Sequence, residues 1–168
     1  MSVIIKIFYI FLVLSSFQAV AQTPKIDLIA TQYFADYAKR DNFEEFLNYY
    51  DDNVVLEDIV YGNHIIGKPA LKQFFNWQDP KFSSLPSTEN LVLSKLVVEG
   101  KEVSAQGHFN RFTYDGSTLG PWRFTIHLTF NEQGKIIHQV DWINYTPRKN
   151  FLGGKDMNQL IPTKALTK

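Results

Sequence analysis

The chain has 168 residues, enough for one domain with a single hydrophobic core. Basic and acidic residues both number 17, and no basic run appears, so nothing in the charge pattern indicates a nucleic-acid-binding surface. The absence of cysteine excludes thiolate chemistry, iron–sulfur clusters and cysteine-bound zinc. Apolar residues make up 45% of the chain and aromatic residues 15%, a composition typical of a globular protein rich in strand-favouring side chains.

Residues 1–21 have the pattern of a secretory signal peptide. One lysine precedes an apolar run from Ile7 to Leu14, and the small-residue sequence Ala19-Val20-Ala21 follows it. A membrane anchor is the alternative, but the apolar run is short and polar residues interrupt it at Ser15–Gln18. We therefore predict cleavage after Ala21, a mature protein that is periplasmic or secreted, and no membrane contact after cleavage.

Three helices are predicted in the first half of the mature chain. The first begins at Pro24, a residue suited to a first helical position, and ends near Arg40. The second starts after Asn42, which forms a capping box with Glu45. The third covers residues 67–75. The first helix has apolar residues at helical spacing, namely Ile26, Ile29, Ala30, Tyr33, Phe34, Tyr37 and Ala38.

The strands are predicted mainly in the second half. The sequence "NVVLEDIV" (53–60) predicts a first strand, and residues 79–90 are expected to form a loop. Long strands then follow at 91–100, 101–114, 121–130 and 136–145, separated by turns with glycine. Helices followed by a strand meander indicate an α+β fold with an antiparallel sheet. We assign residues 22–147 to this domain and residues 148–168 to a tail that is either poorly ordered or packed on the surface.

Alternation along the strands separates two faces of the sheet. Phe124, Ile126 and Leu128 form one apolar set, which predicts that this side of their strand faces the core. The other strands mix polar and apolar residues on both faces, as expected for a sheet with a pocket on one side and a partner on the other. Glu57 and Asp58 are consecutive, so they must face opposite ways.

The order of elements, together with "TQYFADYAKRDNFEEFLNYYDDNVVLEDIVYG", resembles the NTF2-like superfamily. More narrowly, the chain is similar to the SnoaL-like polyketide cyclases and ketosteroid isomerases over about residues 26–146. The resemblance implies a cone-shaped fold, in which a curved antiparallel sheet wraps around the three N-terminal helices and leaves a pocket open at one end. Function in such folds depends on the residues of the pocket.

The resemblance also implies roles for individual residues. Asp58 matches the general base of ketosteroid isomerases, and Tyr33 matches their hydrogen-bond donor to the substrate. Ile126 takes the position of their protonated acid, so the oxyanion hole is incomplete and strict steroid isomerase activity is disfavoured. The SnoaL-like pattern makes His108 and Asp141 face each other as further catalytic residues. The same alignment turns five more residues toward the ligand: Gln106, Asn110, Phe112, Tyr114 and Gln139.

This set of side chains suits proton abstraction next to a carbonyl group. A carboxylate in an apolar pocket becomes more basic because desolvation disfavours its charge. Asp141 or Asp58 is then the base and His108 the acid, with a small, largely apolar ligand and no cofactor. Alternatively, Asp141 belongs to a buried polar network with His108 and Gln139, and Asp58 is solvated at the rim. The remaining histidines do not cluster at metal-ligand spacing, and no metal is predicted.

Three function classes therefore remain open. The first is a cofactor-free isomerase, cyclase or dehydratase, and the second is a non-catalytic module that binds a small molecule. The third is a protein that uses the sheet face only for association. Phe109, Val140 and Trp142 are expected on the outer face, where they predict a homodimer formed by two packed sheets.

Overall fold

The computed structural model describes residues 24–85, 89–145 and 157–161. The predicted signal peptide lies outside the described residues. In this part of the chain, no helix combines the length and the hydropathy needed to cross a membrane. The helices are α1 (Ile26–Lys39), α2 (Phe43–Leu47), α3 (Lys68–Phe75) and the short 3-10 helix η2 (Met157–Leu160). The strands are β1 (Tyr50–Asp58), β2 (Asn63–Ile66), β3 (Phe82–Ser84), β4 (Leu91–Glu99), β5 (Glu102–Phe109), β6 (Phe112–Tyr114), β7 (Ser117–Leu119), β8 (Trp122–Phe130) and β9 (Ile136–Ile143).

The three predicted helices are present and end where the local sequence indicates. Helix α1 ends at Arg40, which adopts a left-handed conformation with φ 56°. Asn42 caps α2: its side-chain oxygen accepts a hydrogen bond from the Glu45 amide at 3.2 Å, and its amide donates to the Glu45 carboxylate at 2.9 Å. Helix α3 has a proline in its first turn. Proline has no amide hydrogen, and amides of the first turn have no intrahelical acceptor, so no helical hydrogen bond is lost there.

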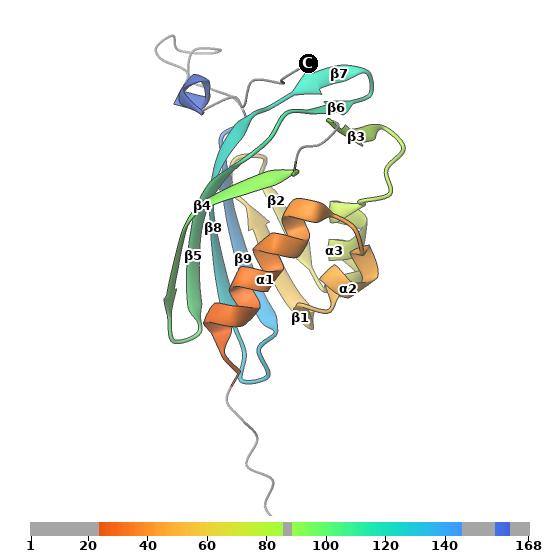
Figure 1. Cartoon of the computed structure of the whole chain (residues 1–168). Coiled ribbons are helices and arrows are strands. Elements are labelled where there is room, and N and C mark those ends of the chain that lie inside the picture. Colours follow the sequence, from red (N-terminus) through yellow and green to blue (C-terminus); the bar gives the residue numbers. More distant parts are fainter. Residues whose placement is uncertain (1–23, 86–88, 146–156, 162–168) are drawn as a thin grey trace, which may run out of the picture.

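A six-stranded sheet in the order β2-β1-β9-β8-β5-β4 forms the body of the fold. Figure 1 shows the sheet curving around α1, with α2 and α3 beside that helix. This confirms the α+β cone. The sheet is not antiparallel throughout, however, because β1 and β9 pair in parallel. Alternation could not predict this pairing, since it joins strands from opposite ends of the domain.

The predicted strand 101–114 is divided into two strands. β5 ends at Phe109, and the Asn110 amide donates to the Asn90 carbonyl at 2.9 Å. Beyond this point β6 joins β3 and β7 in a separate three-stranded sheet. β3 lies within the predicted loop 79–90 and β7 within the predicted turn 115–120, so both predictions were wrong. Because the strand is interrupted after Phe109, the side chains of later residues do not continue the alternation between the two faces of β5.

The hydrophobic core lies between α1 and the inner face of the six-stranded sheet. The predicted apolar set of Phe124, Ile126 and Leu128 is buried there, which confirms the assignment of that face. Gly107 is required beside this core, because a Cβ at this position would lie 2.2 Å from the Val92 carbonyl oxygen and 2.6 Å from the Phe124 ring. Glycine therefore allows the Phe124 ring to approach β5 closely.

The described part of the tail packs against the end of the sheet, the second of the two predicted alternatives. Asn158 is buried, and its amide donates to the Asn144 carbonyl at 3.0 Å. The Asn158 side-chain oxygen accepts from the Arg123 backbone amide at 3.1 Å. These bonds hold residues 157–161 against β8 and the end of β9.

Candidate functional site

A cavity of about 320 Å³ opens between the end of α1, α3 and the smaller sheet. This size lies within the range of small-molecule sites. Its wall is mainly aromatic, with a few polar groups and a single carboxylate at the sheet side, Asp141. The lining includes Tyr37, Arg40, Phe74, Phe75, Asp79, Phe82, Asn90, Phe109, Asn110, Arg111, Phe112, Tyr114, Trp122, Ile143 and Tyr145. We call this space the inner pocket.

Asp141 lies on β9 and is 3% exposed. Burial raises the pKa of its carboxyl group to about 7, the hydrogen bond from Gln139 lowers it, and the charge of Asp58 adds to the increase. The Gln139 amide donates to Asp141 Oδ1 at 2.8 Å. A carboxyl group with this pKa exists in both protonation states near neutral pH and can therefore act as a general acid or base.

Asp58 is the neighbour of Asp141 across the parallel β1–β9 pair, and it is 2% exposed. Its Oδ2 accepts a hydrogen bond from the Tyr145 hydroxyl at 2.9 Å, and its Oδ1 accepts from the Tyr61 amide at 3.2 Å. Glu57 turns to the other face, where it pairs with His138 at 2.9 Å. The predicted opposite orientation of Glu57 and Asp58 is therefore confirmed, and a solvated rim position for Asp58 is excluded.

A chain of buried hydrogen bonds supports Asp141 from the side of α1. The Tyr33 and Tyr50 hydroxyls lie 2.7 Å apart, and the Tyr50 hydroxyl donates to Gln139 Oε1 at 2.7 Å. Burial raises the pKa of both tyrosines far above its usual value, so they remain neutral donors. Because the Gln139 oxygen is held in this way, its amide group is directed to Asp141. Tyr33 thus belongs to the support of Asp141 and not to the pocket wall.

The sequence profile of the SnoaL-like domain family matches residues 30–139. The chain belongs to the SnoaL-like domain family. Solved structures agree on the fold. A protein from Shewanella putrefaciens assigned as a SnoaL-like polyketide cyclase is 14% identical, with a TM-score of 0.60 over 74% of this chain and 93% of its own. No curated protein matches this chain.

Two further structures share this fold at similar identity. One, from Mesorhizobium loti and also assigned as a SnoaL-like polyketide cyclase, is 18% identical, with a TM-score of 0.57 over 71% of this chain and 99% of its own. The other, from Catenulispora acidiphila, has a ketosteroid isomerase-like fold and was solved with trimethylamine. It is 14% identical, with a TM-score of 0.56 over 72% of this chain and 86% of its own.

Tyr37 is a pocket residue of this SnoaL-like domain that the sequence prediction missed. It lies one helical turn after Tyr33, lines the inner pocket, and stacks on Trp77. Within the described residues its hydroxyl has no hydrogen-bond partner. Burial and the charge of Asp141 raise its pKa, so it remains a donor at neutral pH. Both tyrosines belong to the predicted apolar stripe of α1. Tyr37 lies nearer the end of the helix that borders the inner pocket, whereas Tyr33 lies one turn deeper in the core.

The predicted pairing of His108 with Asp141 is wrong. Gly107 occupies the inner position on β5, so its neighbours Gln106 and His108 point to the outer face. His108 lies opposite Arg123 in the β5–β8 register, and partial burial lowers the pKa of its imidazole. For the same reason Phe109, which was expected outside, lies inside and contacts Tyr37 and Phe124.

The remaining predicted ligand-binding residues have different positions. Asn110, Phe112 and Tyr114 line the inner pocket, as expected, because the chain bends after β5. Ile126, to which the resemblance gives the position of the protonated acid, is fully buried in the core. Gln139 is also buried and reaches the pocket only through its bond to Asp141.

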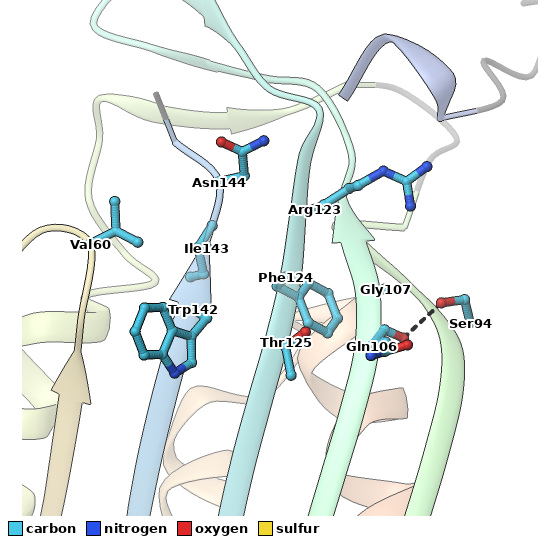
Figure 2. A pocket seen from close by; sticks show the side chains of 10 residues that line it. All are labelled: Val60, Ser94, Gln106, Gly107, Arg123, Phe124, Thr125, Trp142, Ile143 and Asn144. Atoms are coloured by element: carbon cyan, nitrogen blue, oxygen red, sulfur yellow. Dashed lines mark hydrogen bonds between the residues drawn. The ribbon is translucent and has the colours of Figure 1, made fainter. Parts of the chain in front are cut away.

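A second hollow, of about 550 Å³, lies on the outer face of the sheet (Figure 2). Gln106, Thr125 and Trp142 line it from three neighbouring strands, and no carboxylate does so. Among the described residues, no group of three or more His, Asp or Glu side chains could hold a metal ion. The inner pocket is therefore the better candidate for acid–base chemistry.

Proposed function

We propose that this SnoaL-like protein binds a small, largely apolar carbonyl compound in the inner pocket and moves a proton at the carbon beside the carbonyl group, without a cofactor. The observation that carries the proposal is Asp141, a buried carboxyl group with a pKa of about 7 at the wall of an aromatic pocket. A base of this pKa combines a large deprotonated fraction at neutral pH with useful basicity.

The proton transfer uses the pocket residues in complementary roles. The Asp141 carboxylate accepts the proton from the carbon, and the electron pair of the broken C–H bond forms an enolate. The negative charge then collects on the carbonyl oxygen, where the Tyr37 hydroxyl is available as a donor. Asp141 returns the proton to a second carbon in an isomerisation, or to a departing hydroxide in a dehydration.

Hydrogen–deuterium exchange of a model ketone tests this proposal without knowledge of the natural substrate. The benzo-fused cyclic ketone 2-tetralone is incubated with the protein in D2O, and loss of its α-proton signal is followed by NMR. We expect the wild type to accelerate exchange over buffer and D141N to reduce the acceleration by about 10²- to 10⁴-fold, the usual contribution of a general base. Equal exchange with wild type and D141N would contradict the proposal.

The alternative is a non-catalytic module that binds a small molecule. The buried hydrogen bond between Gln139 and Asp141 favours this alternative if its role is only to satisfy buried polar groups. In that case 2-tetralone binds to wild type and D141N with similar affinity, and neither protein accelerates exchange. Titration followed by the fluorescence of the pocket tryptophan Trp122 measures binding separately from exchange.

We also propose that the outer face associates with a second copy of the chain. Val92, Val97 and Trp142 are exposed on this face, and Trp142 is 50% exposed. Apolar side chains gathered on one sheet face favour a two-fold symmetric contact. Sedimentation velocity should give a dimer for the wild type and a monomer for W142E; a monomeric wild type at the same concentration contradicts the proposal.

A further inference from the structure

Arg40 lies at the open end of the inner pocket and is held against aromatic rings. Its guanidinium carbon is 4.0 Å from the centre of the Phe82 ring and 5.3 Å from the Trp77 ring. Both contacts are of the cation–π type. A guanidinium packed on aromatic faces keeps its N–H groups available for hydrogen bonds at the edge of its plane.

The charge of Arg40 has no acidic partner in the part of the chain that the structure describes. No carboxylate there lies within ion-pair distance of its guanidinium, and no hydrogen bond leaves its side chain. The other pocket carboxylate near the mouth, Asp79, accepts from the Tyr114 hydroxyl at 3.1 Å and from the Lys81 amide at 2.9 Å. Burial lowers the pKa of Arg40, because loss of hydration disfavours the charged guanidinium group.

The backbone conformation of Arg40 is also unusual. Its φ of 56° lies in the left-handed region, where helix ends usually have glycine. An arginine at such a position carries backbone strain, and the loss of hydration of a half-buried charge adds to it. Strain and an uncompensated charge that occur together at a pocket are typical of a binding residue.

We propose that Arg40 binds a carboxylate group of the ligand, so that the substrate class is an apolar carbonyl compound that also carries a carboxylate. Guanidinium and carboxylate groups match in two parallel hydrogen bonds. Tyr37 lies one helical turn before Arg40 and faces the same pocket, whereas Asp141 lies on the sheet side. A ligand anchored by its carboxylate at Arg40 can therefore extend its carbonyl group toward Tyr37 and Asp141. This inference rests on the proposed function, because it concerns the ligand of the same pocket.

Binding of a matched pair of probes tests the inference. The probes are 2-naphthoate, which carries the carboxylate, and 2-acetylnaphthalene, a neutral ketone of similar shape. We expect the wild type to bind 2-naphthoate at least about tenfold more tightly, because hydrogen bonds to charged groups contribute this much when partly shielded from water. In R40Q and R40G this preference should disappear. R40G is included because the left-handed backbone favours glycine, so folding is retained there.

Lys39 provides the matched control, since it is the exposed neighbour in the last turn of α1 and does not line the inner pocket. K39Q removes the same charge and should keep the preference for 2-naphthoate. Equal binding of both probes by the wild type overturns the inference, as does an equal loss of preference in K39Q. These measurements do not depend on proton transfer, so they can fail while the exchange of 2-tetralone by Asp141 succeeds, and the reverse.

Discussion

The two faces of the central sheet place the same kinds of residue in opposite environments. Glu57 and Asp58 are consecutive on β1, yet Glu57 pairs with His138 in contact with solvent, whereas Asp58 is buried beside Asp141. The carboxyl group of Asp141 has a pKa raised to about 7 by the same burial. The environment that a strand provides, and not the residue type, decides whether a carboxyl group can serve as a base.

The hydrogen bonds and ion pairs of the two faces also differ in burial. On the inner face Tyr33, Tyr50 and Gln139 form a continuous buried chain that ends at Asp141. On the outer face the pair of Glu57 and His138 is about 40% exposed at both side chains. Exposed pairs contribute little, while buried polar groups are costly when one partner is removed. Substitutions of neighbouring residues on the two faces should therefore differ in their effects.

Replacement of Gln139 by leucine should have the largest effect on stability. Q139L leaves the Tyr50 hydroxyl and the Asp141 carboxyl group without their buried partner, at a cost of about 3 kcal/mol. H138Q, one residue away on the outer face, should change the free energy of unfolding by less than about 0.5 kcal/mol. Urea denaturation measures both, and equal costs would show that the two faces do not differ.

The pH dependence of stability should report the buried acid. The pKa of Asp141 is about 7 in the folded protein and near 3.8 in the unfolded chain, so between these values only the folded state retains the proton. Stability should therefore fall as pH rises from about 4 to 7 and level off above 7. D141N removes this dependence and should be more stable than the wild type at pH 8 by up to about 4 kcal/mol. Parallel pH profiles of the two proteins would contradict the assignment.

Replacement of Asp58 should reduce proton transfer less than replacement of Asp141. Asp58 holds the Tyr145 hydroxyl and adds to the raised pKa of Asp141, so D58N should slow the exchange of 2-tetralone by about tenfold. E57Q changes the preceding residue on the outer face and should leave the rate within about twofold. A rate loss in E57Q as large as in D58N would remove the distinction between the faces.

Replacement of His108 should have the smallest effect. The sequence indicated a catalytic histidine opposite Asp141, but His108 lies on the outer face beside Arg123. H108A should therefore leave the exchange rate within about twofold and the stability within about 0.5 kcal/mol. A strong loss of exchange with unchanged stability would mean that His108 reaches the inner pocket.

Local patterns predicted much of the fold. The apolar stripe of α1, the Asn42 cap and the opposite orientation of Glu57 and Asp58 depend only on residues close in sequence. The face of β5 could not be read in this way, because both of its faces contain polar and aromatic residues. The orientation of β5 depends on Gly107, which faces inward because the Phe124 ring, from a strand later in the sequence, packs directly against it.

The inner pocket was predictable only in part for the same reason. Asp58 and Asp141 follow from alternation and from family resemblance, but their adjacency depends on the parallel pairing of β1 with β9. Tyr37 and Arg40 face the pocket because α1 ends at its mouth, which the sequence of the helix alone does not specify. Residues whose role depends on a packing partner far along the chain are the ones that sequence patterns do not identify.

The parallel pairing of β1 with β9 also has a consequence for how the protein folds. Asp58 and Asp141 are more than eighty residues apart in sequence, and β9 comes after the other strands of the sheet in chain order. Contacts of such long range form slowly, because the chain must close a large loop before the contact is gained. During synthesis the two carboxyl groups cannot meet until β9 has been made. The proposed catalytic pocket is therefore assembled late, and a nascent chain that lacks β9 contains no acid–base site.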